Sequence, residues 1–306
     1  MLLLKQMIIL FLLMATGYIL KKINIISPAG EKTMSGIVVN IANPALVLSA
    51  AINPESTIAG RELLVTMLLA LAVYFVLLIL AFLFPRIIRV PAPSRGAYSV
   101  MMVFSNIGFM GFPLLSAMYG PEALLYASPF MIIYNILIYT YAIALMDRGH
   151  KWDLKYTLSR IFNVGVIACI LTIVLYLARL PVPEVIETTI GHMSALTAPL
   201  SMMVIGASMS NMHIRELLTD AGLIVFCIAK LLIIPVIGVF CIKSLGFSPM
   251  MTGVCLIMLG TPVGSMTAMI AGQADSPDYP LVARGVALST VLSVATLPAV
   301  FMITGI

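Results

Sequence analysis

Two polar breaks inside apolar segments contain the residues of this chain best suited to bind a ligand. The first break covers residues 105–113 (SNIGFMGFP) and the second covers residues 260–265 (GTPVGS). Lipid offers no hydrogen-bond partners, so an interrupted helix at membrane depth persists only where protein buries it or where it lines a watery cavity. Two breaks at corresponding positions in the halves of a chain are typical of a transporter's substrate site.

The breaks provide amide, hydroxyl and freed backbone groups. Asn106 can donate and accept hydrogen bonds, and Pro113 is expected to free carbonyl groups one turn earlier. If the breaks cross, two helix N-termini point at one spot near the membrane midplane, and such a spot favours an anion. The alternative is a pair of kinks that neighbouring helices fill. The substrate-binding residues predicted in the breaks are Ser105, Asn106, Gly108, Pro113, Thr261, Pro262 and Gly264.

Polar residues in other apolar segments could line the same cavity. Lys230 is the ionisable residue nearest to the centre of any segment, where an unpaired ammonium is costly. It would either neutralise an anionic substrate or bind carbonyl groups freed by Pro235. Arg284 would contact the substrate or extend to the membrane interface. The remaining predicted substrate-binding residues are Asn43, Pro44 and Asn135, of which Asn43 could instead form an interhelical hydrogen bond of about 0.6 kcal/mol.

The composition shows which elements must hold these residues. The chain is 61% hydrophobic and 9% charged, whereas soluble domains are roughly 25% charged. The apolar runs have helical length, unlike the shorter alternating strands of a membrane barrel. The sequence therefore predicts an all-α integral membrane protein. The ten predicted spans are residues 2–21, 31–52, 62–85, 96–119, 122–146, 161–180, 185–210, 217–245, 248–273 and 279–305.

Basic residues set the predicted orientation. They gather in the odd-numbered loops, which the positive-inside rule places in the cytoplasm. Both termini are then outside, and the hydrophilic loop 147–160 is cytoplasmic. The net charge of +5 comes mainly from such loops, so it gives no indication of nucleic-acid binding. The four cysteines lie in apolar runs without paired spacing and are interpreted as small core residues.

The two halves of the chain resemble each other. The sequence RELL occurs at residues 61–64 and again at 215–218, while Pro44 and Pro199 share the spacing of Asn106 and Thr261. Each half has an odd number of spans, so the second half enters the membrane from the opposite side. The sequence therefore predicts two inverted five-helix repeats, residues 1–146 and 161–306, joined by loop 147–160. Inverted repeats support alternating access.

Several kinds of chemistry have no sequence signal. No Asp or Glu lies near the middle of any predicted span, which argues against ion exchange through a buried carboxylate. The chain has no Walker loop, so ATP does not drive it directly. The three histidines have no metal-binding or catalytic spacing, and no nucleophile–base pair is visible. We therefore predict neither an enzyme nor a metal or other cofactor.

Residues 106–120 (NIGFMGFPLLSAMYG) resemble the span-four motif of the auxin efflux carrier family, the PIN-like carriers. Residues 230–235 (KLLIIP) resemble that family's basic residue and proline in span eight. Residues 276–278 (SPD) resemble the turn before its last span, and residues 139–140 with 147–149 resemble the end of span five. The resemblance covers the whole chain except for the long cytoplasmic loop of the plant members.

The resemblance implies ten helices with crossed breaks in spans four and nine, as in bile-acid symporters and sodium/proton antiporters. Spans 1, 2, 6 and 7 would form a scaffold that often dimerises, and spans 3–5 and 8–10 would form the transport unit. Asn106 would contact the carboxylate of the substrate, and Pro262 matches the second crossover. Ser105 stands where the plant carriers have proline, and Glu62 only approximates their acidic residue in span three. The short loop is similar to that of bacterial-type members, which are linked with malonate or malate.

These observations predict a secondary carrier of the cell membrane. Its cargo would be a small organic anion, either a carboxylate such as malonate or malate or an auxin-like acid. The implied partners are the lipid bilayer and a second copy of the chain. One alternative is a symporter or exchanger of the same fold that couples to sodium or protons. Another is a membrane sensor that binds a ligand without moving it.

Overall fold

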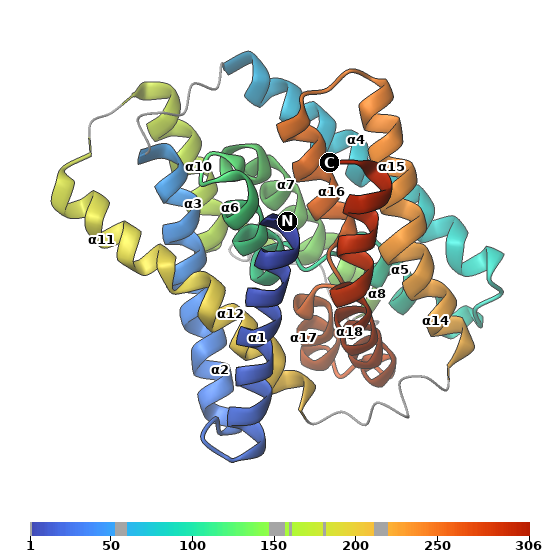
Figure 1. The fold of residues 1–306 in the computed structure, drawn as a ribbon. Coiled ribbons are helices and arrows are strands. Elements are labelled where there is room, and N and C mark those ends of the chain that lie inside the picture. The colour runs from blue at the N-terminus through green and yellow to red at the C-terminus, as the bar shows by residue number, and fades with distance from the viewer. Residues whose placement is uncertain (1, 53–59, 147–156, 159–160, 180–181, 211–219) are drawn as a thin grey trace. The chain divides into compact units, whose positions relative to one another are not determined.

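The computed structural model describes residues 2–52, 60–146, 157–158, 161–179, 182–210 and 220–306 (Figure 1). These parts of the chain are helical, apart from turns and one isolated β-bridge. Within the described residues, six helices are long and apolar enough to cross a membrane: 28–52, 60–87, 123–146, 184–209, 221–244 and 279–304. The same residues contain three shorter apolar helices, 107–119, 164–178 and 249–260. The all-helical prediction is confirmed for the described residues, and the ten-span inverted repeat stays a prediction.

The first half of the chain contains α1 (Leu2–Lys22), α2 (Pro28–Ile37), η1 (Val38–Ala42), α3 (Asn43–Ile52), α4 (Gly60–Ile87), η2 (Ala92–Ser94), α5 (Arg95–Val103), η3 (Ile107–Gly111), α6 (Phe112–Tyr119), α7 (Ala123–Leu137), η4 (Ile138–Ala142) and α8 (Ile143–Met146). The second half contains α10 (Val164–Ala178), α11 (Glu184–Ala195), α12 (Thr197–Met209), α14 (Ala221–Ile228), η5 (Ala229–Ile233), α15 (Ile234–Ser244), α16 (Pro249–Gly260), α17 (Ser265–Gln273) and α18 (Tyr279–Thr304). The segments η1, η3, η4 and η5 are π-helical turns.

Local sequence signals explain where several helices begin. Ser27 caps α2 by accepting a hydrogen bond from Gly30 N, and Ser248 caps α16 by accepting one from Met251 N. Both serines precede a proline at the first helical position, where a missing N–H costs nothing. Asn163 caps α10 in the same way. The dipeptides Ser27-Pro28 and Ser248-Pro249 therefore mark helix starts.

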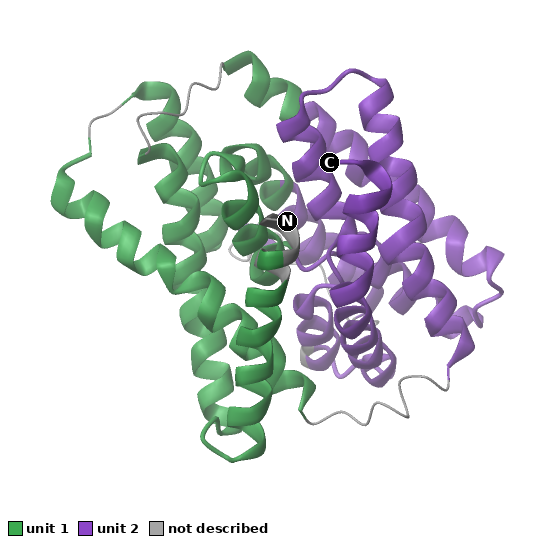
Figure 2. Ribbon diagram, in the orientation of Figure 1, with its two compact units in different colours: residues 1–66, 107–132, 162–212 green, residues 67–106, 133–161, 213–306 purple. Residues whose placement is uncertain are grey.

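The described residues form two compact units (Figure 2). Unit 1 contains residues 1–66, 107–132 and 162–212, and unit 2 contains residues 67–106, 133–161 and 213–306. The predicted spans 1, 2 and 7 fall in unit 1 with α10 of span 6, whereas the helices of spans 8, 9 and 10 fall in unit 2. The chain passes from unit 2 to unit 1 between Asn106 and Ile107, inside the first break. Movement of a transport unit against a scaffold stays a prediction.

Unit 1 has a close helix pair. Gly17 of α1 faces the backbone of Met203, and Gly206 of α12 faces the backbone of Met14, so a side chain at either glycine would overlap main-chain atoms. Small residues allow membrane helices to approach in this way. Lys21 and Glu31 form an ion pair at 2.7 Å between the end of α1 and α2. Glu62 accepts a hydrogen bond from the Tyr126 hydroxyl at 2.7 Å.

Unit 2 is built around α18, which packs against α5, α14, η5, α15, α16 and α17. Phe226 of α14 makes edge-to-face contacts with Tyr98 and Phe84. The packing on α18 also brings η5, α16 and α17 together around this helix. The unit thereby brings the second break next to the middle of α18.

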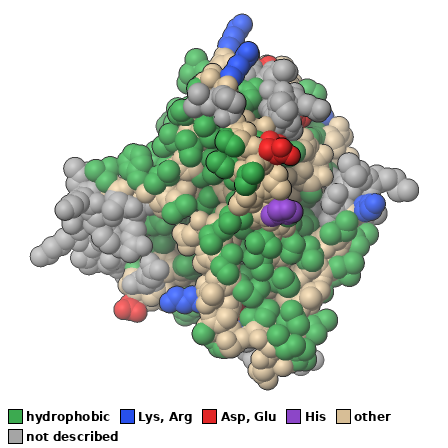
Figure 3. Space-filling model, turned by 90° about the vertical axis from the view of Figure 1, so that its left-hand side faces the viewer, with side chains coloured by type: hydrophobic (Ala, Val, Ile, Leu, Met, Phe, Trp, Pro, Cys, Tyr) green, Lys and Arg blue, Asp and Glu red, His purple; other side chains and the backbone are tan. Residues whose placement is uncertain are grey.

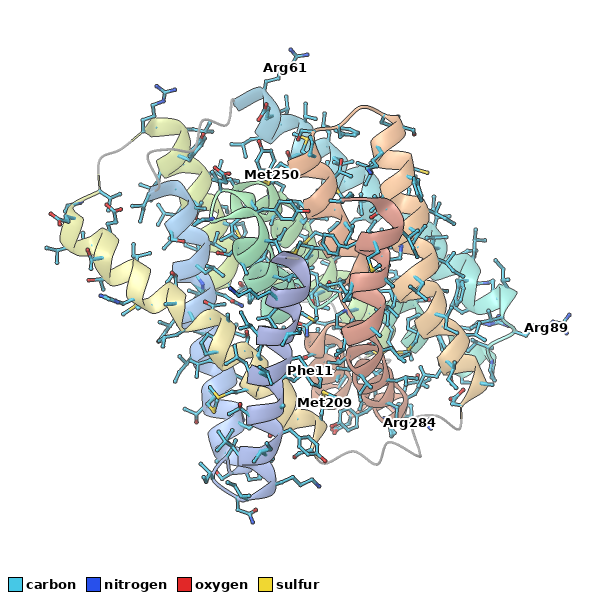
Figure 4. All side chains as sticks on the ribbon, in the orientation of Figure 1. Phe11, Arg61, Arg89, Met209, Met250 and Arg284 are labelled. Carbon is cyan, nitrogen blue, oxygen red and sulfur yellow. The ribbon has the colours of Figure 1, made fainter. Side chains whose placement is uncertain are left out.

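The outer surface is apolar, as expected of a protein embedded in lipid. Figure 3 shows a face on which hydrophobic side chains predominate and charged side chains lie mostly towards its margins. Arg61 projects outward at the start of α4 (Figure 4). Cys169, Cys227 and Cys255 are buried, in agreement with their interpretation as core residues. Cys241 is exposed, so that interpretation is wrong for this residue, which lies on an outward side of α15.

Candidate functional site

The first break consists of extended backbone at residues 104–106, here called the first arm. Helix α5 ends at Val103, and the chain is extended at Phe104, with φ −101° and ψ 103°. The π-helical turn η3 begins at Ile107 and leads into α6, in which Pro113 is the second residue. A proline near a helix start needs no N–H partner. The interruption is thus narrower than the predicted range 105–113, and Pro113 lies within a helix of unit 1.

The second break consists of residues 261–264, here called the second arm. Helix α16 ends at Gly260 and α17 begins at Ser265, as the sequence predicts. Thr261 is extended, with φ −68° and ψ 149°, because the proline that follows disfavours helical backbone at this position. Gly264 is also extended, with φ −67° and ψ 133°. The dipeptide Thr261-Pro262 therefore explains where the helix stops.

The two arms pair with each other inside unit 2. Ser105 and Val263 form an antiparallel bridge. Asn106 N donates a hydrogen bond to Pro262 O at 2.7 Å, and Gly264 N donates one to Phe104 O at 2.9 Å. Backbone groups at membrane depth must find partners in the protein, and each arm provides them for the other. The two breaks are therefore joined by backbone hydrogen bonds into one crossing and are not two independent kinks.

Lys230 holds the first arm. The Lys230 Nζ atom donates hydrogen bonds to Met102 O and to Ser105 Oγ, both at 2.8 Å, and the side chain is 0% exposed. Within a continuous helix Met102 O would accept from Asn106 N, which here bonds Pro262 O instead. Lys230 thus caps a helix end, as a cation does favourably. The prediction that Lys230 binds carbonyl groups freed by Pro235 is wrong, because its carbonyl partner lies on α5.

Ser289, which is not among the residues predicted from the sequence, holds the second arm. Val263 N donates a hydrogen bond to Ser289 Oγ at 3.0 Å, and Ser289 Oγ donates one to Val286 O at 3.0 Å. The available signal was the group of hydroxyl residues Ser289, Thr290 and Ser293 within an apolar span. Such residues commonly bond only to their own helix, so the signal does not single out Ser289.

Gly264 allows the arms to approach closely. A Cβ atom at Gly264 would lie 3.0 Å from Ser105 O and 3.0 Å from the Tyr134 hydroxyl oxygen. Tyr134 is buried and makes an edge-to-face contact with Phe104, with ring centroids 5.2 Å apart. Tyr134 is not among the residues predicted from the sequence, although its neighbour Asn135 is. Tyr134 therefore brings a second hydroxyl group to the crossing, beside Gly264.

Two buried polar atoms at the crossing have no hydrogen-bond partner in the described part of the chain: Asn106 Nδ2 and Thr261 Oγ1. Asn106 is 3% exposed and Thr261 is 0% exposed. Leaving a buried polar group unpaired costs about 1–3 kcal/mol. One of these atoms lies on each arm. The neighbouring backbone groups, Asn106 N and Pro262 O, do have partners, because they bond to each other. A ligand or water that bonded the two unpartnered atoms would recover that cost.

The other predicted residues are placed as follows. In unit 1, Asn43 lies at the start of α3, and its Nδ2 atom is 3.4 Å from where a Cβ at Gly108 would be. Asn43 Oδ1 is buried and lacks a hydrogen-bond partner among the described residues. Pro44 follows Asn43 in α3, and Asn135 is buried in α7. Arg284 is half-buried in the first turns of α18 (Figure 4).

The structure thus separates the candidate residues into two groups. Unit 2 brings together Ser105, Asn106, Thr261, Pro262, Gly264 and Lys230. Unit 1 brings together Asn43 and Gly108, with Pro44 beside Asn43 in α3 and Pro113 in α6. No set of three or more His, Cys, Asp or Glu side chains in the described residues could hold a metal ion. The group in unit 2 consists of neutral hydrogen-bonding residues and one cation.

Comparison with known proteins assigns the chain to a family. Residues 2–301 match the family model described as membrane transport protein. The chain belongs to this family. The membrane transport protein is 24% identical over 291 residues to an uncharacterized transporter of Methanothermobacter thermautotrophicus, covering 94% of this chain and 93% of the relative. It is 22% identical over 292 residues to an uncharacterized transporter of Methanocaldococcus jannaschii, covering 94% of each.

The match confirms the predicted membership of the auxin efflux carrier family. It also establishes the protein as a transporter with several membrane-spanning helices. The relatives are transporters by name and their names specify no cargo. The cargo of this membrane transport protein must therefore be argued from its own residues.

Proposed function

We propose that this protein is a secondary carrier that moves a small organic anion by alternating access, with the cargo bound at the crossing of the two arms. The observation that carries this proposal is the unpartnered amide nitrogen of Asn106. An amide nitrogen is a hydrogen-bond donor only, so its missing partner is an acceptor. The hydroxyl of Thr261 can donate as well. A carboxylate supplies acceptor oxygens for both groups.

Charge supports an anion over a cation. Lys230 is fully buried, and the ion pair recorded among the described residues, Lys21–Glu31, lies in unit 1. No Asp or Glu is among the buried residues of the described chain. The recorded partners of Lys230 at the crossing are a carbonyl and a hydroxyl and not a carboxylate. An anion that approached the arms would balance the charge of this ammonium.

We also propose the membrane orientation and the assembly that the sequence predicts. The protein would lie in the cell membrane with both termini outside and loop 147–160 in the cytoplasm, most of which lies outside the described residues. Spans 1, 2, 6 and 7 would form the scaffold of a homodimer. The lack of buried carboxylates in the described residues supports transport without obligatory coupling to sodium or protons.

Uptake into proteoliposomes tests the proposal. Purified protein is reconstituted, and labelled malonate, malate and indole acetate are added with and without sodium and proton gradients. We expect saturable uptake of at least one of these anions in either gradient condition. Removal of one hydrogen bond to a charged group predicts a loss of about tenfold or more in Asn106→Ala. Asn40→Ala is the matched control, because Asn40 is exposed and bonds Gly36 O of its own helix.

Each other outcome has a defined meaning. No saturable flux of any carboxylate, or an Asn106→Ala variant that behaves like wild type, would overturn the proposal. Flux that requires a sodium or proton gradient would establish the coupled symporter or exchanger. Binding of the labelled anion without flux would establish the sensor.

A further inference from the structure

The two arms of the crossing are each held by a side chain from a third helix. Lys230, from η5, binds the first arm through Ser105 Oγ and the adjoining carbonyl of Met102. Ser289, from α18, binds the second arm through Val263 N. The arms also bind each other through the two backbone hydrogen bonds on either side of the Ser105–Val263 bridge. The second arm therefore has partners on two sides.

The position of Val263 in the bridge explains why it needs Ser289. In this bridge the hydrogen bonds are made by the residues that flank Ser105 and Val263, namely Asn106 N with Pro262 O and Gly264 N with Phe104 O. The N–H of Val263 therefore points away from the first arm and cannot bond to it. Val263 is 0% exposed, so its N–H is shielded from bulk water. Ser289 Oγ is the acceptor that satisfies this buried donor.

Ser289 is suited to this task because its hydroxyl both donates and accepts a hydrogen bond. It donates to Val286 O within α18 and accepts from Val263 N. A hydroxyl has one donor and two acceptor sites, so the donated bond fixes the direction of the lone pairs. Thr290 provides the contrast: it is equally buried, and its hydroxyl also donates to Val286 O at 2.7 Å, but no hydrogen bond to the second arm is recorded for it.

We propose that Ser289 is a positioning residue that holds the second arm, and with it the unpartnered Thr261 hydroxyl, in the conformation that binds the cargo. This inference rests on the proposed function for the identity of the cargo, whereas the hold on the arm is independent of it. Thr261 lies two residues before Val263, on the same extended segment. Loss of the Ser289 bond frees the middle of that segment. The two ends of the arm stay bonded to the first arm and to the flanking helices α16 and α17.

Amide hydrogen exchange measures the hold directly, without any cargo. The full-length protein in nanodiscs is compared as wild type, Ser289→Ala, Ser289→Cys and Thr290→Val. We expect exchange in peptides covering residues 261–264 to be about tenfold faster in Ser289→Ala, since a lost hydrogen bond of ordinary strength corresponds to roughly that factor. The thiol of Ser289→Cys is a weak acceptor and should give an intermediate rate. Thr290→Val removes an equally buried hydroxyl and should leave the exchange rate unchanged.

Malonate uptake then measures how the hydrogen bond between Ser289 and Val263 affects transport of the cargo. We expect Ser289→Ala to raise KM about tenfold with a maximal rate within about twofold of wild type, and Thr290→Val to change neither value. KM should rise in the same order as the exchange rate, from wild type through Ser289→Cys to Ser289→Ala. Monodispersity and the melting temperature check that all three proteins are folded. Unchanged exchange at residues 261–264 in Ser289→Ala overturns the inference, and so does faster exchange with an unchanged KM. A wild-type protein that moves no carboxylate contradicts the proposed function, while the exchange measurement still decides whether Ser289 holds the arm.

Discussion

Lys230 Nζ donates a hydrogen bond to Met102 O at 2.8 Å, which links η5 to the end of α5 across 128 positions of sequence. This carbonyl group is left without its helical partner because the chain turns into the first arm immediately afterwards. A neutral side chain could satisfy the carbonyl, but the ammonium does so while also bonding Ser105 Oγ. The relationship makes Lys230 part of the structure of the crossing as well as its source of positive charge.

We therefore expect Lys230→Met to abolish carboxylate uptake and to lower thermal stability only modestly. The substitution removes two hydrogen bonds, but it also removes the cost of burying an ammonium, and replacing a buried charge with an apolar residue can be nearly neutral for stability. Uptake and the melting temperature are measured in parallel. Lys243→Met is the control, since Lys243 bonds Thr304 O at the end of α18 and should retain uptake. Retained uptake in Lys230→Met would contradict this role.

The two bonds of Lys230 can be separated by substituting Ser105. Ser105→Ala removes the hydroxyl partner and leaves the Met102 carbonyl bonded. A hydrogen bond to a charged group contributes about 1.5–3 kcal/mol, so we expect a loss of uptake smaller than that in Lys230→Met. Because Lys230→Met is expected to abolish uptake, the double-mutant cycle is completed with thermal unfolding, which does not depend on residual uptake. In the double variant Ser105→Ala with Lys230→Met, the serine change should add almost nothing to the loss of stability. Additive effects in this double-mutant cycle would show that the two residues do not act through their hydrogen bond.

Gly264 should not tolerate a side chain. Its Cβ would lie 3.0 Å from Ser105 O and from the Tyr134 hydroxyl, and the backbone oxygen cannot move without breaking the bridge. We expect Gly264→Ala to reduce uptake about tenfold or more, as overpacking costs typically 1–3 kcal/mol. Adding Tyr134→Phe removes one of the two close contacts and should restore part of the activity. If Tyr134→Phe restores nothing, the contact with Ser105 O alone explains the loss.

The sequence was sufficient to predict those features that depend on local chemistry. The breaks were located from Pro262, Asn106 and the neighbouring glycines, because proline and glycine change backbone preferences wherever they occur. The second break is found within the residues predicted for it, and the described parts of the chain are helical, whereas the ten-span arrangement stays a prediction. The first break was predicted too long, because Pro113 is equally compatible with a break and with the start of α6.

Features that depend on the partner of a side chain were not predictable in this way. The sequence places Lys230 near the centre of a span, where it needs a partner, but its bond to Met102 joins residues far apart in sequence. Ser289 looks no different from Thr290, which bonds only within its helix. Periodicity shows which side of a helix is buried and does not show which atom faces a buried N–H. The pairing of the two arms, from which these roles follow, had to be seen in the structure.

Packing in unit 1 gives a prediction that concerns stability and not the cargo. Gly206 of α12 faces the backbone of Met14, so Gly206→Ala should force α1 and α12 apart and destabilise the protein by about 1–3 kcal/mol. Gly191 of α11 is the matched control, because a Cβ there meets no atom within 4 Å. Gly191→Ala should leave stability unchanged or raise it slightly, since alanine is the better helix former. Thermal unfolding in detergent distinguishes the two, and equal melting temperatures for both variants would show that the close approach of α1 and α12 does not contribute to stability.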